Sequence, residues 1–364
     1  MNLLNTYKNK KVLIIGNTGF KGSWLTVVML KMGAKVYGIS NGVPSNPSFF
    51  AKAKLKSKIR YFNIDIKNNN KLNKKINLIK PDFIFHLAAQ ALVLESIFNP
   101  VNTLETNING TINVLNSIRD LKNDCSIVII TSDKCYLNDE RKTPYTETDP
   151  LGGKDPYSAS KAAAEIIFSC YCQTYFKDKK NIRISSARAG NVIGGGDWSS
   201  NRIIPDVVKS FSSNQKFVVR NPNSTRPWQH VLEPISGYIF LCHFLSNKKL
   251  GVNFESFNFA PNKFKNVSVK QIINKIKNNW PDIRPEFKRE KKKSLESKLL
   301  QLNPGKSKKL LNWQSVLTLD ETVSYTVEWY KSYFNNENIY SFSEHQVESY
   351  FKMANKKNKW NINI

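Results

Sequence analysis

The sequence predicts an α/β fold of the Rossmann type, a doubly wound parallel sheet with a smaller, partly interleaved α/β portion that binds substrate. Short apolar runs alternate with helical patterns through the first half of the 364-residue chain, as is typical of β-α-β units with right-handed crossovers. The runs VLII, FIF and IVII are apolar throughout, which is expected of strands covered by helices on both faces. A glycine-rich turn follows the first run.

The first strand is expected at residues 12–15, and the turn after it leads into a helix over residues 20–32. The pattern then repeats, with apolar runs of strand length between helical segments. We expect further strands at residues 35–40, 59–64, 83–88, 127–132 and 182–189, and longer helices at residues 103–122 and 157–176.

The second half of the chain has a different texture, because three glycines at residues 194–196 and several prolines indicate loops around short elements. Ser268 has the position of an N-cap for a helix over residues 269–279, and Asp320 is expected to begin a helix that runs through Tyr330. We therefore predict a dinucleotide-binding domain, a substrate-binding portion that partly returns to the first domain, and a C-terminal tail. Their ranges are 1–190, 191–335 (with part of 231–247 returning) and 336–364.

The net charge of +27 comes from 55 Lys and Arg against 28 Asp and Glu, so a nucleic-acid-binding protein is one alternative. The basic residues are spread along the chain, often beside Asn and Ile, and we interpret them as a solvated surface with no nucleic-acid partner. A positive field would still attract an anionic diphosphate. No apolar run approaches the roughly 18 residues that a membrane span needs, so no membrane partner is expected.

Cysteine usage argues against a disulfide framework or a metal site, because no two cysteines have CxxC or metal-ligand spacing. The five are Cys125, Cys135, Cys170, Cys172 and Cys242. No signal peptide is expected in the N-terminal segment, whose apolar run is only four residues long. A reducing cytoplasm and no bound metal are the expectations.

The glycine-rich turn is the first motif that indicates chemistry. Glycines at this place let the backbone come close to a pyrophosphate, whose charge lies at the helix N-terminus. The alternative is a tight turn with a purely structural role, but the place between an apolar strand and a helix favours dinucleotide binding. The predicted cofactor-binding residues are Gly16, Asn17, Thr18, Gly19, Phe20, Lys21 and Gly22.

The end of the second strand does not decide between NAD and NADP. A carboxylate there holds the adenosine ribose of NAD, and an Arg suits NADP, but Ile39, Ser40 and Asn41 provide neither. Asp65, at the end of the third strand, is a candidate contact for the adenine amino group. An equally good interpretation is that Asp65 is a carboxylate at a helix N-terminus.

Tyr157 and Lys161 are the candidate catalytic pair, since a phenol and an ammonium four residues apart share one helix face. A nearby cation favours the phenolate, which can take a proton from a sugar hydroxyl. The spacing alone is weak, because Tyr7 with Lys11 and Tyr175 with Lys179 also match it. Only Tyr157 opens a long helix one loop after the fifth strand.

These features resemble the extended short-chain dehydrogenase/reductase family, and the segments HLAAQ (86–90) and TNINGT (106–111) strengthen the likeness. The resemblance covers roughly residues 10–330 and is most specific to the group of CDP-glucose 4,6-dehydratases. The segments that carry it are GNTGFKGSWL (16–25), TSDKCY (131–136), DPLGGKDPYSASKA (149–162), AGNVIGGGDW (189–198) and RPWQHVLEP (226–234).

The resemblance implies a lyase with bound NAD that acts on a CDP-sugar in deoxysugar synthesis for a surface polysaccharide. The C4 hydroxyl would be oxidised, water would leave across C5 and C6, and the hydride would return to C6. It also implies a homodimer or homotetramer. Further contacts with NAD are implied at Ile66, Leu87, Ala88 and Ala89, and with substrate at Gln90.

The triplet Ser132-Asp133-Lys134 stands where relatives that act on dTDP-glucose have an Asp-Glu pair after the fifth strand. By resemblance, Asp133 is the acid for the C6 oxygen, and Ser132 hydrogen-bonds the C4 oxygen. Lys134 is either the C5 base, which requires a strongly lowered pKa, or a cation that stabilises the enolate. The structural alternative is an ion pair at a strand end.

Asn191 and Arg226 occupy positions that bind the diphosphate in this family, and an Arg fork suits phosphate geometry. Arg202 and Arg220 are weaker substrate candidates, for which a structural role is as good an interpretation. Departures from the family pattern occur at Ala91, Leu94, Glu95, Lys154 and Asn303. The first three bear on sugar or nucleotide preference, so an epimerase or another nucleotide-sugar dehydratase of the same fold is the enzymatic alternative.

Overall fold

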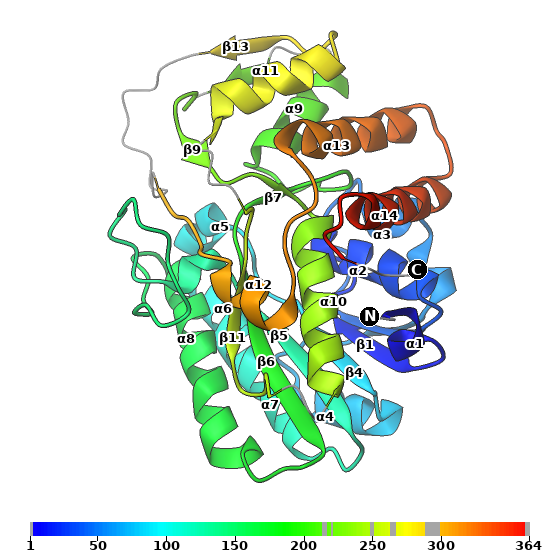
Figure 1. Ribbon diagram of the computed structural model, residues 1–364, viewed down its shortest axis with the longest axis vertical. Coiled ribbons are helices and arrows are strands. Elements are labelled where there is room, and N and C mark those ends of the chain that lie inside the picture. Colours follow the sequence, from blue (N-terminus) through cyan, green and yellow to red (C-terminus); the bar gives the residue numbers. More distant parts are fainter. Residues whose placement is uncertain are drawn as a thin grey trace.

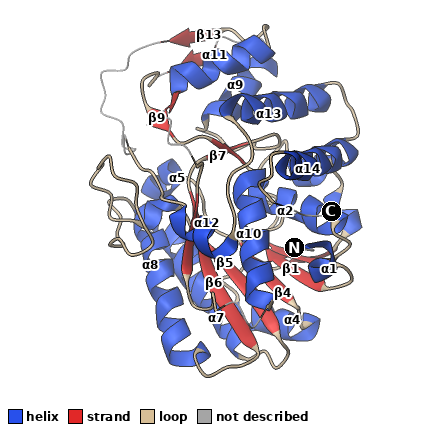
Figure 2. Cartoon of the chain, in the orientation of Figure 1, coloured by secondary structure: helices blue, strands red, loops and turns tan. Residues whose placement is uncertain are grey.

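The computed structural model describes residues 3–212, 217–219, 221–247, 251–262, 267–287 and 299–360. A seven-stranded sheet lies at its centre, in the order β11-β6-β5-β4-β1-β2-β3, with every neighbouring pair parallel (Figures 1 and 2). Its strands are β1 (Lys11–Ile15), β2 (Lys35–Ser40), β3 (Arg60–Asn63), β4 (Phe83–His86), β5 (Cys125–Ile130), β6 (Ile182–Ala189) and β11 (Ser256–Phe259). The predicted Rossmann-type fold is therefore confirmed.

The strand order reverses between β1 and β4, which lie side by side although β2 and β3 come between them in sequence. In open α/β sheets, ligands bind outside the carboxyl ends of the strands at such a switch point. The glycine-rich turn follows β1 and the segment Leu87–Gln90 follows β4, so both meet at this place. The edge strand β11 was not expected, because its run of four residues lies about 70 residues beyond its partner β6.

Helices cover the sheet on both faces, and successive strand residues face opposite cores. Val12 and Ile14 belong to a core shared with α1 (Leu3–Tyr7), α2 (Phe20–Lys31) and α10 (Leu232–Ser246). Leu13 and Ile15 belong to a second core, shared with α4 (Asn69–Ile79), α7 (Gly110–Arg119) and α8 (Pro156–Tyr171). Burial on both faces explains why these strands are apolar runs without alternation.

Helix α10 follows the loops of the second half of the chain, yet it packs against β5 and β6 and against α2 of the first half. Twelve of its fifteen residues are buried, as expected of a helix enclosed on all sides. The chain therefore returns to the sheet at α10. The division at residue 190 stays a prediction.

A smaller group of elements lies above the sheet in the view of Figure 1. It contains the helices α9 (Ile203–Ser212), α11 (Val269–Asn279) and α13 (Leu319–Phe334) and three two-stranded sheets. The strand pairs are β7 (Val192–Ile193) with β10 (Gln229–His230), β9 (Thr225–Arg226) with β12 (Val267–Ser268), and β8 (Phe217–Val219) with β13 (Pro285–Phe287). Shorter helices are α3 (Phe49–Lys52), α5 (Val93–Phe98), α6 (Pro100–Leu104) and α12 (Gly305–Leu311), with single turns η1 (Leu55–Lys58), η2 (Glu105–Asn109), η3 (Asp133–Cys135) and η4 (Cys172–Phe176).

Helix caps agree with the sequence at one position and differ at another. Ser268 caps α11 with a full capping box, in which its hydroxyl and the Gln271 side chain each bind the other's backbone N–H. The later helix begins before Asp320, because Thr318 forms the same capping box with Glu321. A Thr three residues before a Glu was the stronger signal.

The segment after Asn335, which was predicted as a C-terminal tail, is helical and packed against the rest of the chain. It forms α14 (Ile339–Lys356), an 18-residue helix capped by Asn338, and α14 packs against α2 and α13. Its buried face includes Ser343 and Gln346 beside apolar residues. These polar residues hide the helical period that the apolar residues alone would show.

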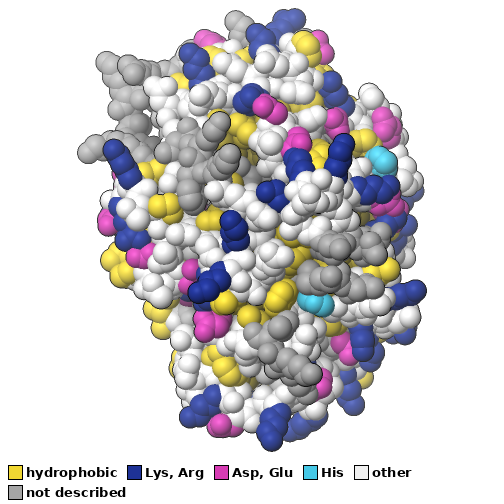
Figure 3. All heavy atoms as spheres, in the orientation of Figure 1, with side chains coloured by type: hydrophobic (Ala, Val, Ile, Leu, Met, Phe, Trp, Pro, Cys, Tyr) yellow, Lys and Arg dark blue, Asp and Glu magenta, His cyan; other side chains and the backbone are white. Residues whose placement is uncertain are grey.

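The charged residues on the face shown in Figure 3 do not form one basic surface. On the face in Figure 3, Lys and Arg side chains are scattered among Asp, Glu and uncharged groups. This distribution agrees with the interpretation of the basic excess as a solvated surface. In the parts of the chain with described coordinates, no helix combines the length and apolar character that crossing a bilayer requires.

Candidate active site

The glycine-rich turn is packed so closely that two of its glycines admit no side chain. Gly16 has a φ of +95°, and a Cβ there would lie 2.5 Å from the backbone nitrogen of Ala88, after β4. A Cβ on Gly22 would lie 2.1 Å from the Gly16 carbonyl oxygen. These contacts hold the turn, the start of α2 and the β4 loop together.

The N-terminus of α2 has the groups that a diphosphate requires. Its N-cap, Gly19, provides no side-chain hydrogen bond, and the first N–H groups of a helix have no intrahelical partner. Asn17 is fully buried, and among the described residues its side-chain nitrogen has no hydrogen-bond partner. Its oxygen accepts a hydrogen bond of 2.8 Å from Ser40 at the end of β2. The turn therefore fits a dinucleotide, which would occupy these donors.

The candidate adenine contact, Asp65, is already engaged by protein groups. Its carboxylate accepts hydrogen bonds from the Asn41 side chain at 2.7 Å and from the Lys67 backbone at 2.8 Å. The next residue, Ile66, is buried against Gly110, where a Cβ would lie 2.4 Å from the Ile66 methyl group. Ile66 thus supports the site by packing against α7.

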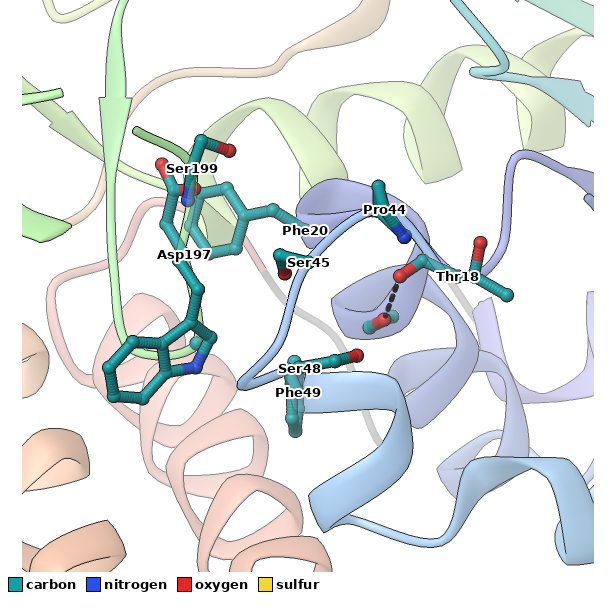
Figure 4. A pocket seen from close by; sticks show the side chains of 11 residues that line it. Thr18, Phe20, Pro44, Ser45, Ser48, Phe49, Asp197 and Ser199 are labelled. Carbon is teal, nitrogen blue, oxygen red and sulfur yellow. Dashed lines mark hydrogen bonds between the residues drawn. The ribbon is translucent and has the colours of Figure 1, made fainter. Parts of the chain in front are cut away.

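A small pocket borders the glycine-rich turn (Figure 4). It is lined by Thr18 and Phe20 from the turn, by the loop after β2, and by residues 196–199 after β7. The Ser23 hydroxyl donates to the Thr18 carbonyl at 3.5 Å within it. Neither Tyr157 nor Asp133 lines this pocket, so it lies outside the reaction centre.

Tyr157 and Lys161 project from the first two turns of α8, which Asp155 caps through the backbone of Ser158. The Tyr157 backbone N–H donates to the Ser96 hydroxyl at 3.2 Å. The ammonium of Lys161 lies 5.9 Å from the centre of the Tyr157 ring. Both side chains are buried, so the predicted pair comes together in a site with little water.

Burial sets the charge states of this pair. It raises the pKa of Tyr157 to about 12, although a hydrogen bond with Ser132 and the charge of Arg202 lower it in part. Burial also lowers the pKa of Lys161 to about 8. In the chain alone, the phenol is therefore protonated at neutral pH, contrary to the expectation that the nearby cation favours phenolate. Desolvation of the phenolate is the larger effect.

The triplet Ser132-Asp133-Lys134 begins at the carboxyl end of β5, where Asp133 opens the short turn η3. The Ser132 hydroxyl donates to the Asp133 carboxylate at 2.8 Å, and both residues are buried. A Cβ on Gly190 would lie 3.2 Å from the other Asp133 oxygen. Since Ser132 also contacts Tyr157, the structure brings Tyr157, Lys161, Ser132 and Asp133 into one cluster.

Lys21, predicted as a cofactor contact, and Tyr238, for which the sequence predicted no role, lie in the same cluster. The Lys21 ammonium donates to the Tyr238 hydroxyl at 3.5 Å, from the first turn of α2 to α10. Burial, followed by the charge of Arg202, lowers the pKa of Lys21 to about 8, while Asp133 opposes this. Tyr238 is fully buried in α10. No spacing signal in the sequence identifies this tyrosine.

Two of the predicted substrate residues, Arg202 and Arg226, have side chains engaged by neighbouring protein groups. Arg202 forms an ion pair of 2.9 Å with Asp197, and its charge reaches Tyr157. Arg226, in β9, donates to the Thr225 carbonyl at 2.8 Å. It precedes Pro227, which lies 4.0 Å from the Cβ position of Gly190.

The other predicted contacts have mixed outcomes. Asn191 is exposed in the loop after β6. The Gln90 amide nitrogen donates to the Leu92 carbonyl and to Thr103, so protein groups occupy its two donors. Arg220 lies outside the described residues. In the described ranges, no group of three or more His, Cys, Asp or Glu could hold a metal ion.

Comparison with known proteins adds to this geometry. The family pattern described as GDP-mannose 4,6 dehydratase matches residues 13–326. The chain belongs to this family. It is 38% identical over 351 residues to CDP-glucose 4,6-dehydratase of Salmonella typhimurium, covering 95% of this chain and 97% of that protein.

Proteins of lower identity also match the chain, and two of the matches below are solved structures. UDP-glucose 4-epimerase of Mycoplasma pneumoniae is 24% identical over 337 residues, which are 89% of this chain and 98% of that protein. The dTDP-glucose 4,6-dehydratase of Bacillus anthracis, solved in complex with NAD, superimposes with a TM-score of 0.72 at 20% identity, covering 91% of this chain and 99% of that one. UDP-glucose 4-epimerase of Stenotrophomonas maltophila, solved with bound NAD, gives 0.78 at 18% identity over 90% of this chain and 99% of that one.

Proposed function

We propose that the protein is a CDP-glucose 4,6-dehydratase, a lyase that converts CDP-glucose to CDP-4-keto-6-deoxyglucose. The observation that carries the proposal is the cluster of Tyr157 and Lys161 with Ser132 and Asp133, at the switch point of a dinucleotide-binding sheet. The 38% identity to CDP-glucose 4,6-dehydratase over 95% of the chain supports the choice of sugar nucleotide. The product would serve deoxysugar synthesis for a surface polysaccharide.

The cofactor would be NAD, held by residues 16–22 with the diphosphate at the N-terminus of α2. Two observations support this assignment. The backbone of Gly16 lies close to that of Ala88, and among the described residues the buried side-chain nitrogen of Asn17 has no hydrogen-bond partner. Leu87, Ala88 and Ala89 would border the cofactor after β4, and Asp65 would reach the adenine end. When bound, NAD would supply the acceptor for the hydride from C4 of the hexose and the donor for its return to C6.

Tyr157 would take the proton of the C4 hydroxyl during oxidation. Burial holds its pKa at about 12 in the chain alone, so further positive charge must come within reach before the phenolate forms. Lys161 beside the ring supplies one charge, and the oxidised nicotinamide would supply another. Exclusion of water strengthens both interactions.

Asp133 and Lys134 would carry out the loss of water. The 4-keto group acidifies the proton at C5, and Asp133 would protonate the departing C6 oxygen while Ser132 hydrogen-bonds the C4 oxygen. Lys134 would either take the C5 proton or stabilise the enolate. The hydrogen bond that one Asp133 oxygen accepts from Ser132 fixes the orientation of the carboxyl group, whose other oxygen would carry the proton to be transferred.

The substrate diphosphate would bind to Arg226, with Arg202 and Asn191 beside it. A guanidinium presents two parallel donors to phosphate oxygens. Arg220 stays a prediction for the same role. Gln90 is the weakest of the set, because its amide donors already serve Leu92 and Thr103.

The protein would assemble as a homodimer or homotetramer through α5, α6 and α8. These helices carry a group of large apolar side chains that are at least one-third exposed, from Leu94 at 36% to Phe98 at 77%. Exposed apolar groups of this kind mark interaction surfaces. The others are Ile97, Val101, Leu104 and Ile166. Light scattering should give the mass of an oligomer, and Phe98→Glu should shift it toward the monomer.

The cytoplasm is the compartment that fits this chemistry. All five cysteines, at positions that the structure describes, are free thiols, and four of them are buried. Free thiols persist in a reducing compartment.

The test of the function is incubation of the protein with CDP-, dTDP-, GDP- and UDP-hexoses, followed by mass spectrometry. CDP-glucose should lose one water with no net consumption of added cofactor. A faster reaction of dTDP-glucose would overturn the substrate but keep the reaction class. An isomer that keeps its C6 hydroxyl would favour a 4-epimerase, the activity of several proteins with this fold.

A further inference from the structure

A buried ion pair lies beneath the reaction centre and takes no part in the chemistry proposed above. Arg188 of β6 and Glu165 of α8 are 2.7 Å apart, and they are 3% and 1% exposed. Ser186 donates to the same Glu165 oxygen at 2.8 Å. Both side chains of the ion pair are therefore enclosed by protein.

The ion pair forms hydrogen bonds with residues on both sides of the Ser132-Asp133-Lys134 triplet. The hydroxyl of Thr131, immediately before the triplet, donates to Glu165. Tyr136, two residues after the triplet, accepts a hydrogen bond of 2.8 Å from Arg188 and donates one of 2.8 Å to Asn258 of β11. The turn η3 is thus held at its two ends by one buried network.

The same network holds the helix that carries the catalytic pair. Glu165 follows Lys161 by four residues and Tyr157 by eight on α8, so the three side chains lie along one helix face. Glu165 also reaches Lys161 electrostatically and raises its pKa, against the larger effect of burial. One carboxylate therefore touches the strand end that carries the acid and lies on the helix face that carries Tyr157.

Stability alone does not explain a polar network at this place. A well-packed apolar group of similar volume is often as stable as a buried ion pair, because desolvation of two charges offsets their attraction. What hydrogen bonds add is a fixed geometry. Two groups that must act in succession on one sugar ring benefit from such a fixed distance.

We propose that Glu165 and Arg188 are positioning residues that hold the Ser132-Asp133-Lys134 triplet in register with Tyr157 and Lys161. The network then lets the loss of water follow the oxidation of C4 without movement of the sugar. This inference rests on the proposed function. It assigns a role to residues that do not touch the substrate.

The test uncouples the triplet from the network and leaves the ion pair in place. Thr131→Val keeps the shape of the side chain and removes its hydrogen bond to Glu165, and Tyr136→Phe removes the bond to Arg188. Mixed with CDP-glucose, both variants should still form enzyme-bound NADH, seen as nicotinamide absorbance, and oxidation should slow less than the loss of water because only Ser132 of the triplet serves both steps. Loss of water should slow by a factor on the order of 10–100, the scale for misplacement by about 1 Å.

Two matched variants control for the loss of any buried hydroxyl. Thr326→Val removes a buried bond to a helix carbonyl in α13, and Tyr7→Phe removes one to α10. Both should oxidise substrate and lose water like the wild type. Thr131→Ser restores the hydroxyl and should recover most of the rate.

The outcomes separate this inference from the proposed function. If the wild type does not dehydrate CDP-glucose, the function fails, whatever the variants do. If the wild type does so, and Thr131→Val and Tyr136→Phe slow both steps equally or neither step, the positioning role is overturned. Glu165→Gln is a second probe, which keeps the shape of the side chain and weakens its interactions with Thr131 and Arg188. It should also slow the loss of water more than the oxidation.

Discussion

Substitution of glycines in the turn after β1 separates folding from cofactor binding. The two single variants are Gly22→Ala and Gly19→Ala. A Cβ on Gly22 would meet three backbone atoms, the Gly16 oxygen at 2.1 Å, the Asn17 Cα at 2.8 Å and the Gly16 carbonyl carbon at 2.9 Å. A Cβ on Gly19 would meet only the Gly16 oxygen, at 3.5 Å.

The surroundings of these two Cβ positions predict different effects on the stability of the two variants. Non-bonded atoms settle about 3.5 Å apart, so Gly22→Ala must move backbone by about 1 Å or more. Overpacking of this kind costs about 1–3 kcal/mol, and we expect the upper end because the neighbours are backbone. Gly19 has a φ of −72°, which Ala adopts readily, so the smaller entropy of the unfolded chain offsets the poorer N-cap and Gly19→Ala should change stability by less than about 1 kcal/mol.

Urea denaturation gives the stabilities, and calorimetric titration with NAD gives the affinities. Gly22→Ala should lose stability and NAD binding together, whereas Gly19→Ala should remain stable and bind NAD more weakly, since its methyl group lies where the diphosphate would approach. Normal stability and NAD affinity in Gly22→Ala would refute the account of the turn.

The remaining predictions concern catalysis and pH. Tyr157→Phe should fold and retain NAD but lose turnover by a factor on the order of 10²–10⁴; near-full activity would rule out its role. Asp133→Asn and Lys134→Met should both form bound NADH from CDP-glucose yet release little 6-deoxy product, and exchange of the C5 proton with deuterated water should stop only in the variant that lacks the base. Normal water loss in both would reduce the triplet to a structural strand end. Burial raises the pKa of Glu233 from 4.5 to about 7, so the folded state binds more protons in this range and stability should fall as pH rises through it. The effect is about 3 kcal/mol at about 1.4 kcal/mol per pKa unit, and Glu233→Gln should remove it from a series of denaturation curves.

The features that the sequence predicted well depend on local patterns. Strands covered on both faces must be apolar throughout, so β1, β4 and β5 were visible as runs. The glycine turn was visible because backbone contacts as close as that of Gly22 with Gly16 exclude any other residue. Tyr157 was separated from two other tyrosines with the same spacing by its place after β5.

The features that the sequence did not predict depend on contacts between distant segments. Tyr238 reaches the site only because α10 returns to the sheet. Lys21, which hydrogen-bonds to Tyr238, is 217 residues away from it in the sequence. The charge state of Tyr157 depends on burial by several elements at once, which no local pattern contains. The buried face of α14 was hidden by Ser343 and Gln346.

In the proposed reaction, one site moves a hydride from C4 to C6 of the same sugar while water leaves. CDP-glucose with deuterium at C4, incubated with the enzyme in ordinary water, tests it most directly when the product is examined by NMR. The expected product is a 4-keto-6-deoxy sugar nucleotide with deuterium at C6 and a solvent-derived proton at C5. Deuterium retained at C4, in a product that keeps its C6 hydroxyl, would contradict it.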